Sequence, residues 1–97
     1  MDELTILQAE VLKTLASPRR LEILHRLAVG PSGVGQLADD LCLSQPNVSQ
    51  HLAILQRDGL VRRYREDGHV LWEVVDRRLA EACALIDEIL GPQLAQK

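Results

Sequence analysis

A cluster of side chains that can hydrogen-bond to nucleobases lies between residues 44 and 51 of this 97-residue chain. Its members are Ser44, Gln45, Asn47, Ser49, Gln50 and His51. Asn and Gln each present a donor and an acceptor together. They can therefore pair in bidentate fashion with adenine, and a good pair discriminates against the wrong base by about 1–3 kcal/mol. These residue types predict direct reading of DNA bases.

This chemistry needs a helix that turns the polar side chains outward. The apolar residues Val48, Leu52 and Leu55 recur at helical spacing, which predicts one buried face. Ser44 is a good N-cap, and Gly59 is a typical residue after a helix end. The alternative is an ordinary polar face in contact with solvent. His51 lies next to the buried stripe, where a lone histidine is more often a packing residue than a ligand.

Basic side chains follow this helix. Residues 44–65 carry four arginines and one acid, although the net charge of the chain is −3. Two runs rich in β-branched and aromatic residues, LVRRYRED and GHVLWEVV, are joined through Asp67-Gly68, which predicts a β-hairpin because Gly accepts positive φ. The hairpin residues that could reach phosphate or the minor groove are Arg62, Arg63, Arg65, Gly68 and His69. Arg62 points to the opposite face from Arg63 and Arg65, so the three cannot contact DNA equally. The alternative is a charged edge strand that resists aggregation.

Three further helices are predicted before the polar helix. The first spans about residues 2–15. The second begins at Ser17, a good N-cap followed by Pro18, and ends at Gly30-Pro31. The third has about two turns. The expected inner faces are Leu21, Leu24, Leu27 and Ala28 in the second helix, and Val34, Leu37, Ala38 and Leu41 in the third.

A closing helix, about residues 77–90, is expected after the hairpin, capped by Asp76 and stopped by Gly91-Pro92. The first and closing helices carry apolar stripes more extensive than a small core needs: Leu4, Leu7, Val11, Leu79, Cys83, Ile86 and Leu90. Contiguous exposed apolar surface of this kind marks an interface, which predicts a homodimer. Packing of the two stripes on each other within one chain is the alternative.

The order of elements predicts a mainly α (α+β) fold, a winged helix-turn-helix with about five helices and a two-stranded β-hairpin wing. We expect residues 1–97 to form a single DNA-binding domain with terminal dimerisation helices. In a helix-turn-helix, the second helix lies in the major groove, and its N-terminal residues meet the base edges. That helix is here the polar one. Paired terminal helices would place two such helices about one DNA turn apart.

Three stretches of the chain resemble the ArsR/SmtB family of bacterial winged-helix repressors: LASPRRLEILHRL, QLADDLCLSQPNVSQHLAILQRDGLV and REDGHVLWEV. The resemblance covers about residues 11–76. It implies a homodimeric repressor that binds double-stranded DNA at an imperfect inverted repeat near its own promoter. It also implies release from this operator when an inducer binds.

The inducer is not evident from the sequence. Metal-sensing members of the family carry a cysteine pair where this chain has Gly33 and Gly35. Other members bind zinc through Asp and His pairs in the closing helices, but here Asp76 is followed by Arg77 and Arg78. Zinc needs a tetrahedral set of His, thiolate or carboxylate donors. We therefore expect no metal and no cofactor, and the role of the two arginines stays open.

The chain has two cysteines, Cys42 and Cys83. We interpret both as structural residues, Cys42 at the end of the third helix and Cys83 on an apolar stripe. The alternative is a thiol-based redox sensor, which would need an exposed, low-pKa thiolate near a second cysteine.

Other classes of protein fit less well. No apolar run approaches the roughly 18 residues of a membrane span, and the acidic start does not resemble a secretory signal. With too few cysteines for a disulfide framework, a cytoplasmic protein is expected. No nucleophilic triad or phosphate loop indicates an enzyme, and Asp39-Asp40 is expected on a solvated face. A winged helix that binds proteins instead of DNA is the main rival, supported by the net acidity.

Overall fold

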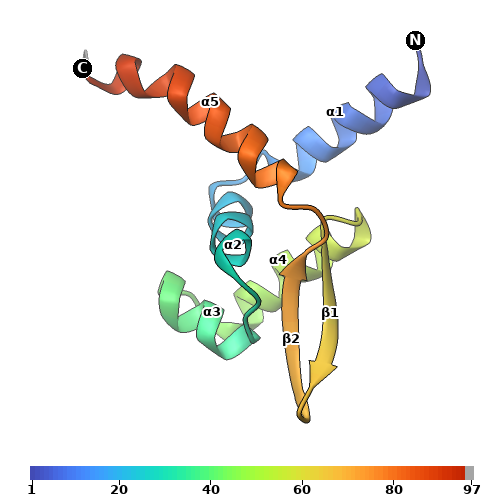
Figure 1. Cartoon of the computed structure of the whole chain (residues 1–97), viewed down its shortest axis with the longest axis vertical. Helices are drawn as coiled ribbons and strands as arrows, with labels where there is room; N and C mark the ends of the chain where they lie inside the picture. The colour runs from blue at the N-terminus through green and yellow to red at the C-terminus, as the bar shows by residue number, and fades with distance from the viewer. Residues whose placement is uncertain (96–97) are drawn as a thin grey trace.

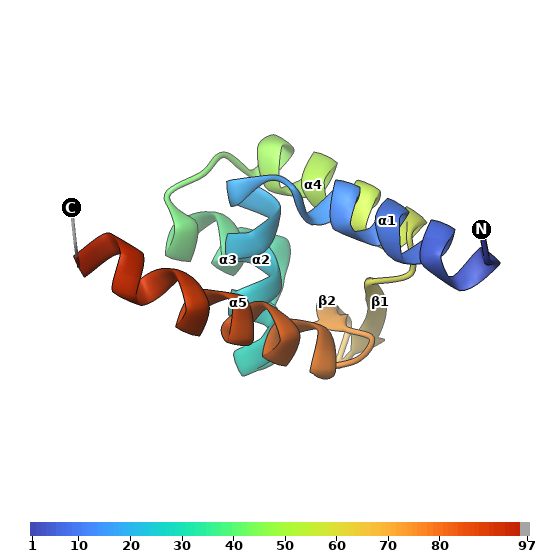
Figure 2. The same cartoon turned by 90° about the horizontal axis from the view of Figure 1, so that it is seen from above.

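The computed structural model describes residues 1–95. Its helices and strands, in chain order, are α1 (Glu3–Leu15), α2 (Pro18–Val29), α3 (Val34–Leu41), α4 (Gln45–Arg57), β1 (Val61–Glu66), β2 (His69–Val74) and α5 (Arg78–Ala95) (Figure 1). The predicted mainly α (α+β) winged helix-turn-helix, with its two-stranded wing, is confirmed. Seen from above, α2 lies between α3, α4 and α5 (Figure 2).

The core forms where α2, α3, α4 and β1 meet. Its buried apolar residues are Leu15, Ile23, Leu24, Leu27, Leu37, Ala38, Val48, Leu52, Leu55 and Val61. Ile23 is fully buried although the predicted inner face of α2 did not include it, and Leu21 and Ala28 are only half-buried. Because α2 contacts helices on several sides, it buries a wider face than a single stripe.

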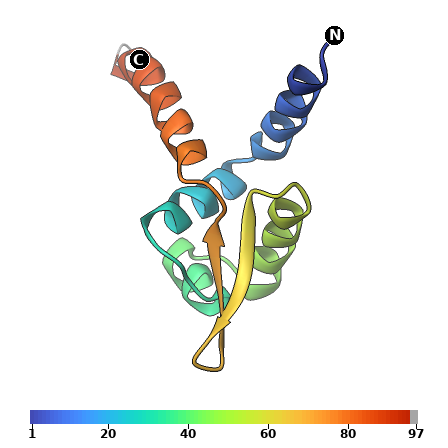
Figure 3. The same cartoon turned by 45° about the vertical axis from the view of Figure 1, so that its right-hand side comes forward.

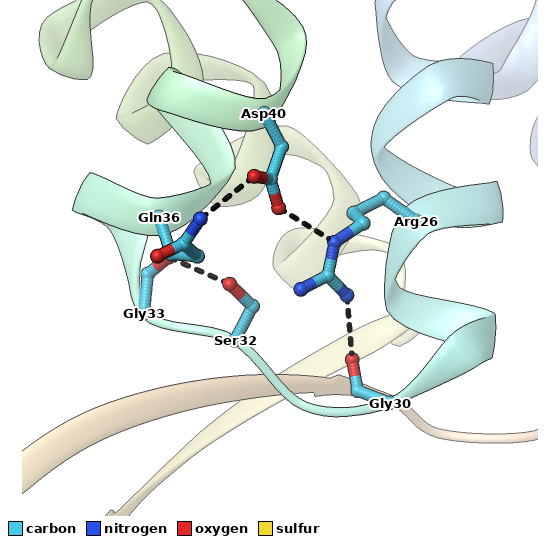
Figure 4. Close-up of polar contacts among 6 residues, drawn as sticks. All are labelled: Arg26, Gly30, Ser32, Gly33, Gln36 and Asp40. Atoms are coloured by element: carbon cyan, nitrogen blue, oxygen red, sulfur yellow. Dashed lines mark hydrogen bonds and ion pairs between the residues drawn. The ribbon is translucent and has the colours of Figure 1, made fainter.

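Helices α2 and α3 are held together by polar side chains. Arg26 Nε donates a hydrogen bond to Asp40 Oδ2 at 2.9 Å, and Gln36 Nε2 donates to Asp40 Oδ1 at 2.7 Å (Figure 4). Arg26 Nη1 also donates to the carbonyl oxygen of Gly30, at 3.3 Å. Asp39 and Asp40 are both exposed, as expected, and the Asp40 carboxylate in addition accepts the hydrogen bonds from Arg26 Nε and Gln36 Nε2. This carboxylate fixes α3 on α2, and α3 in turn supports the first turn of α4.

The turn between α3 and α4 depends on an unusual backbone conformation. Cys42 adopts the left-handed conformation, with φ of 56°, and ends α3. The backbone N–H of Leu43 then donates to the carbonyl oxygen of Ala38 at 2.9 Å, which closes the helix end. The Ser44 side chain accepts a hydrogen bond from the backbone N–H of Asn47 at 3.2 Å, so the predicted N-cap is confirmed.

The wing is an antiparallel hairpin in which Val61 pairs with Val74 and Glu66 with His69. Asp67 and Gly68, with φ of 51° and 80°, make the predicted tight turn. A short bridge, which the sequence did not predict, adds Ser32 beside β2. The Ser32 N–H donates to the Trp72 carbonyl oxygen at 3.0 Å, and the reverse bond is 2.8 Å. The wing is therefore fixed to the segment between α2 and α3.

The terminal helices diverge from the body in a V, on the side opposite the wing tip (Figure 3). Packing of their apolar stripes on each other within one chain is therefore wrong. Of the predicted stripe, Val11, Leu79 and Cys83 pack partly against the core, whereas the remaining four residues are exposed. Within residues 1–95, no helix is apolar and long enough to span a bilayer.

The end of α5 corrects a prediction. The helix does not stop at Gly91-Pro92 but continues to Ala95 with Pro92 inside it. A proline lacks the N–H that would bond to the carbonyl four residues earlier, here that of Glu88. Because about one turn lies beyond Pro92, on an exposed helix end, only this bond is forfeited and solvent can hydrate the freed carbonyl. The predicted cap is confirmed, since Asp76 Oδ1 accepts from the Arg78 backbone N–H at 2.9 Å.

Candidate nucleic-acid interface

Helix α4 is anchored by one face and leaves the other in solvent. Its buried residues Val48, Leu52 and Leu55 each have an exposed fraction of 0%. The exposed polar side chains on its N-terminal half are Gln45, Asn47, Ser49 and Gln50, which we call the amide face. Ser44, at the N-cap, is also exposed. Of the α4 and N-cap residues predicted to contact DNA, all but His51 are therefore exposed.

Gln45 lies at the edge of this face, against α3. A side chain at Gly35, in the first turn of α3, would place its Cβ 3.5 Å from Gln45 Nε2. This position is one of the two at which metal-sensing members of the family carry cysteine. A Cβ at this distance would be in ordinary van der Waals contact with the Gln45 amide, so the first turn of α3 lies directly beside the start of α4.

His51 is half-buried and lies toward the N-terminal end of α2. Its Nδ1 atom is buried and has no hydrogen-bond partner among residues 1–95. Burial lowers the pKa of His51, and the charges of Arg20 and Arg19 lower it further. The imidazole is therefore neutral at pH 7. Because no acceptor faces Nδ1, the proton of the neutral ring belongs on Nε2.

Arg19 and Arg20 were not among the predicted site residues, yet they bring positive charge next to α4. The dipeptide at the start of α2, directly after Ser17-Pro18, was the available signal. Arg19 also pairs with Glu22, with Nη1 and Oε1 3.2 Å apart, so part of its charge is compensated.

The wing arginines have different surroundings. Arg62 faces Glu73 across the hairpin, with Nε 3.4 Å from Oε2, so this exposed pair partly neutralises the arginine. Arg63 lies opposite Trp72 and Arg65 opposite Val70, and neither forms an ion pair with any residue in the range 1–95.

The strand face that carries Arg63 and Arg65 begins at the body with buried Val61 and half-buried Trp72. Farther along this face, toward the tip, the two arginines are exposed beside a shallow cavity of about 270 Å³ that Tyr64 and Val70 also line. Their charge is available at the end of the molecule away from α1 and α5 (Figure 3). Gly68 and His69, at the tip, are also exposed.

Of the two arginines at the start of α5, Arg78 has a clear structural partner. Arg78 binds Asp76 with two nitrogens, Nη2 to Oδ2 at 2.7 Å and Nε to Oδ1 at 3.1 Å. Together with the Arg78 backbone N–H, this guanidinium lowers the pKa of Asp76 to about 2. Arg77 is exposed and forms no ion pair with the rest of the described chain.

The described residues form neither a metal-binding cluster nor a site suited to a reactive thiolate. No cluster of three metal-binding side chains exists within residues 1–95. Cys83 is half-buried, and burial raises the pKa of its thiol, with the charge of Asp87 adding to the effect. A thiolate sensor requires a lowered pKa. Cys42 is exposed, and in the left-handed conformation that ends α3 it serves the turn in the predicted place.

Comparison with known proteins agrees with this geometry. The family model described as "Bacterial regulatory protein, arsR family" matches residues 17–63. An HTH-type transcriptional regulator of Methanocaldococcus jannaschii is 38% identical over 82 residues, which are 84% of this chain and 92% of that protein. The HTH-type transcriptional repressor SmtB of Mycobacterium tuberculosis is 41% identical over 71 residues, 73% of this chain and 53% of that protein.

Solved structures show the same similarity. HlyU from Vibrio cholerae superposes with a TM-score of 0.80 at 35% identity, covering 92% of this chain and 97% of that chain; this relative is named a transcriptional activator. The homodimeric winged helix-turn-helix DNA-binding domain of Mb0332 from Mycobacterium bovis gives a TM-score of 0.82 at 30% identity, covering 97% and 87%. The chain belongs to the ArsR family of winged helix-turn-helix transcriptional regulators.

Proposed function

We propose that the chain binds double-stranded DNA as a homodimer, with α4 in the major groove of each half-site and the wing on the flanking backbone. The observation that carries this proposal is the exposure of the amide face on a helix whose opposite side is fully buried. Neutral amides, which both donate and accept hydrogen bonds, are suited to base edges, whereas a merely solvated helix is usually covered with long charged side chains.

The residues divide between reading and positioning. Asn47 and Gln50 point away from the buried stripe and contact base edges. Ser44 and Ser49 donate to phosphates beside them, and the Nε2–H of His51 is available to a phosphate at the edge of the helix. Arg63 and Arg65 supply the electrostatic attraction, because phosphate neutralisation dominates affinity and is independent of sequence.

The homodimer is supported by where the exposed apolar surface lies. Among residues 1–95, nine of the thirteen exposed large hydrophobic side chains belong to α1 and α5: Leu4, Ile6, Leu7, Leu12, Leu85, Ile86, Ile89, Leu90 and Leu94. Where these helices diverge, an apolar cleft of about 490 Å³ is lined by Val11, Leu60 and Leu79. A second copy of α1 and α5 would cover this surface, as monomers rarely leave so much exposed. The Mb0332 domain is homodimeric.

A two-fold symmetric dimer with two reading helices fits an inverted repeat. We propose that binding at such an operator represses transcription, although the relatives of this chain include both the repressor SmtB and the activator HlyU. We place this activity in the cytoplasm, because transcription is regulated where the chromosome lies. No enzymatic activity is proposed.

The test is selection of bound duplexes from a random DNA library by the purified protein, followed by fluorescence anisotropy at low and moderate salt. The proposal expects an enriched inverted repeat bound with nanomolar affinity, and weaker, salt-sensitive binding of unselected duplex. A winged helix that serves as a protein-interaction module would enrich nothing and would ignore random duplex at low salt.

A further inference from the structure

A polar junction joins the last turn of α1, the first turn of α2 and the C-terminal end of α4. Its members are Thr14, Arg20 and Asp58, and we call it the three-helix junction. The Thr14 hydroxyl donates a hydrogen bond to Oδ2 of Asp58. Arg20 Nε donates to the backbone carbonyl oxygen of Thr14 at 2.6 Å. Thr14 is almost fully buried, with an exposed fraction of 6%, and the Asp58 side chain is 23% exposed, so the contact lies at the edge of the core.

Asp58 is a poor residue for the end of α4 taken alone. It occupies the C-cap, where the helix dipole presents partial negative charge that repels a carboxylate. Two donors offset this repulsion: first the Thr14 hydroxyl from α1, and then the guanidinium of Arg57 at the end of α4 itself, whose Nε lies 3.2 Å from Oδ1. These donors lower the pKa of Asp58. The carboxylate therefore contributes a link to α1 rather than stability to α4.

The link connects two surfaces with different tasks. In the proposed dimer, α1 belongs to the interface between subunits and α4 to the interface with DNA. A 13-residue helix is about 20 Å long, so a tilt of about 10° at its middle moves its first residues by about 2 Å. A displacement of this size breaks a hydrogen bond to a base. Holding the far end of α4 against α1 thus controls where the amide face lies relative to the dimer axis.

We propose that Thr14 and Asp58 are positioning residues that set the distance between the two α4 helices of the dimer and hence the half-site spacing that the protein accepts. Arg20 supports them by holding the α1 backbone. The inference rests on the proposed function, since it presupposes a DNA-bound dimer. The assigned role acts through the position of α4 and requires neither residue to contact DNA.

The test varies the spacing of the selected inverted repeat by one and two base pairs in either direction and measures Kd for each duplex. Thr14→Val removes the hydroxyl without changing the shape of the side chain, and Thr14→Ser restores it. At the preferred spacing, we expect Thr14→Val to weaken binding roughly tenfold and to flatten the spacing profile, with recovery in Thr14→Ser. Binding of random duplex and dimer mass stay unchanged. Thr5→Val, an exposed threonine of the same helix, is the matched control and keeps the wild-type profile.

A second variant protects the test against simple unfolding. Thr14→Val combined with Asp58→Ala removes both partners, which leaves no unsatisfied buried group and is often nearly neutral for stability. We expect its spacing profile to be as flat as that of Thr14→Val. A wild-type profile in either folded variant would overturn the inference and leave the proposed function intact. A wild-type protein that selects no duplex would overturn both.

Discussion

At the residue scale, charges of the same kind differ in what they can do. Arg62, Arg63 and Arg65 are neighbours on β1, yet among residues 1–95 only Arg62 has an acidic partner, Glu73. The alternation of side chains along a strand predicted from the sequence that Arg62 lies on the opposite face from Arg63 and Arg65. The identity of the ion pair required the hairpin register, which places Glu73 directly opposite Arg62.

Arg63→Ala should weaken binding to every duplex and reduce the slope of log K against log salt by about 1, because one phosphate contact is lost. Arg62→Ala is the matched control, and it should change the slope less because Glu73 already compensates Arg62. A salt titration with random duplex measures both. Equal slopes for the two variants would contradict the assignment of Arg63 to phosphate.

Asn47→Ala should act differently, by relaxing specificity. We expect a loss of about 1–3 kcal/mol on the selected duplex and little change on random duplex, since the lost hydrogen bonds are to a base. Gln56→Ala, an exposed amide at the other end of α4, is the control. Competition between selected and random duplex gives the specificity ratio. Asn47→Ala weakening both duplexes alike would place Asn47 on the backbone instead.

His51 should make the folded protein sensitive to mild acid. The pKa of His51 in the folded protein is lowered below the ordinary value of 6.5. Just below pH 6.5 the unfolded chain therefore binds a proton at this residue more readily than the folded chain does. Stability from this residue is complete above pH 6.5 and falls as the pH drops below it. Comparing Tm at pH 7 and pH 5 should show a smaller fall for His51→Gln than for the wild type. The same pH dependence in both proteins would exclude His51 as its cause.

At the element scale, local signals predicted most of the structure. Ser44, Asp67-Gly68 and Asp76 marked helix starts and the hairpin turn, because capping and positive φ depend on a few adjacent residues. The prediction that Pro92 ends the closing helix was wrong, since the effect of a proline on a helix end depends on how many helical residues lie beyond it. The Ser32–Trp72 bridge and the Arg26–Asp40 contact join residues far apart in the chain, and nothing in either local sequence specifies the partner.

Two glycines offer a matched comparison of backbone effects. Apart from the adjacent backbone, no described residue has a heavy atom within 4 Å of a Cβ added at Gly68 or Gly91, so neither substitution causes a clash with another side chain. Gly68→Ala should destabilise the protein by about 1 kcal/mol because its φ is 80°. Gly91→Ala should instead stabilise α5 by up to about 1 kcal/mol, since glycine is a poor helix former. Urea unfolding at fixed protein concentration measures both; shifts of the same sign would contradict this account.

At the scale of the whole molecule, the two ends are specialised. Apolar side chains collect on α1 and α5, and unpaired arginines and amides collect on α4 and the wing. The sequence predicted the stripes but not the breadth of the apolar surface, because Ile6, Leu12 and Ile89 lie outside the stripes. The divergence of α1 and α5 leaves these residues exposed within the described range 1–95 (Figure 1).

Ile86→Glu should dissociate the dimer, because a carboxylate buried in an apolar interface has no partner. Val29→Glu is the control, as Val29 is 86% exposed at the end of α2 and belongs to neither terminal helix. Sedimentation velocity at micromolar concentration should give a monomer for the first variant and a dimer for the second. A dimeric Ile86→Glu protein would place the interface elsewhere.

The most direct test of the central claim uses the side-chain amides that the chain provides at both ends. Asn47 is the single asparagine, Gln45 and Gln50 lie with it on the amide face, and Gln8 and Gln93 lie on α1 and α5. NMR spectra of the side-chain NH₂ groups, recorded during titration with the selected duplex, report on each end separately. We predict that the resonances of Asn47, Gln45 and Gln50 shift while those of Gln8 and Gln93 do not. Shifts confined to Gln8 and Gln93 would contradict the assignment of α4 as the helix that reads DNA.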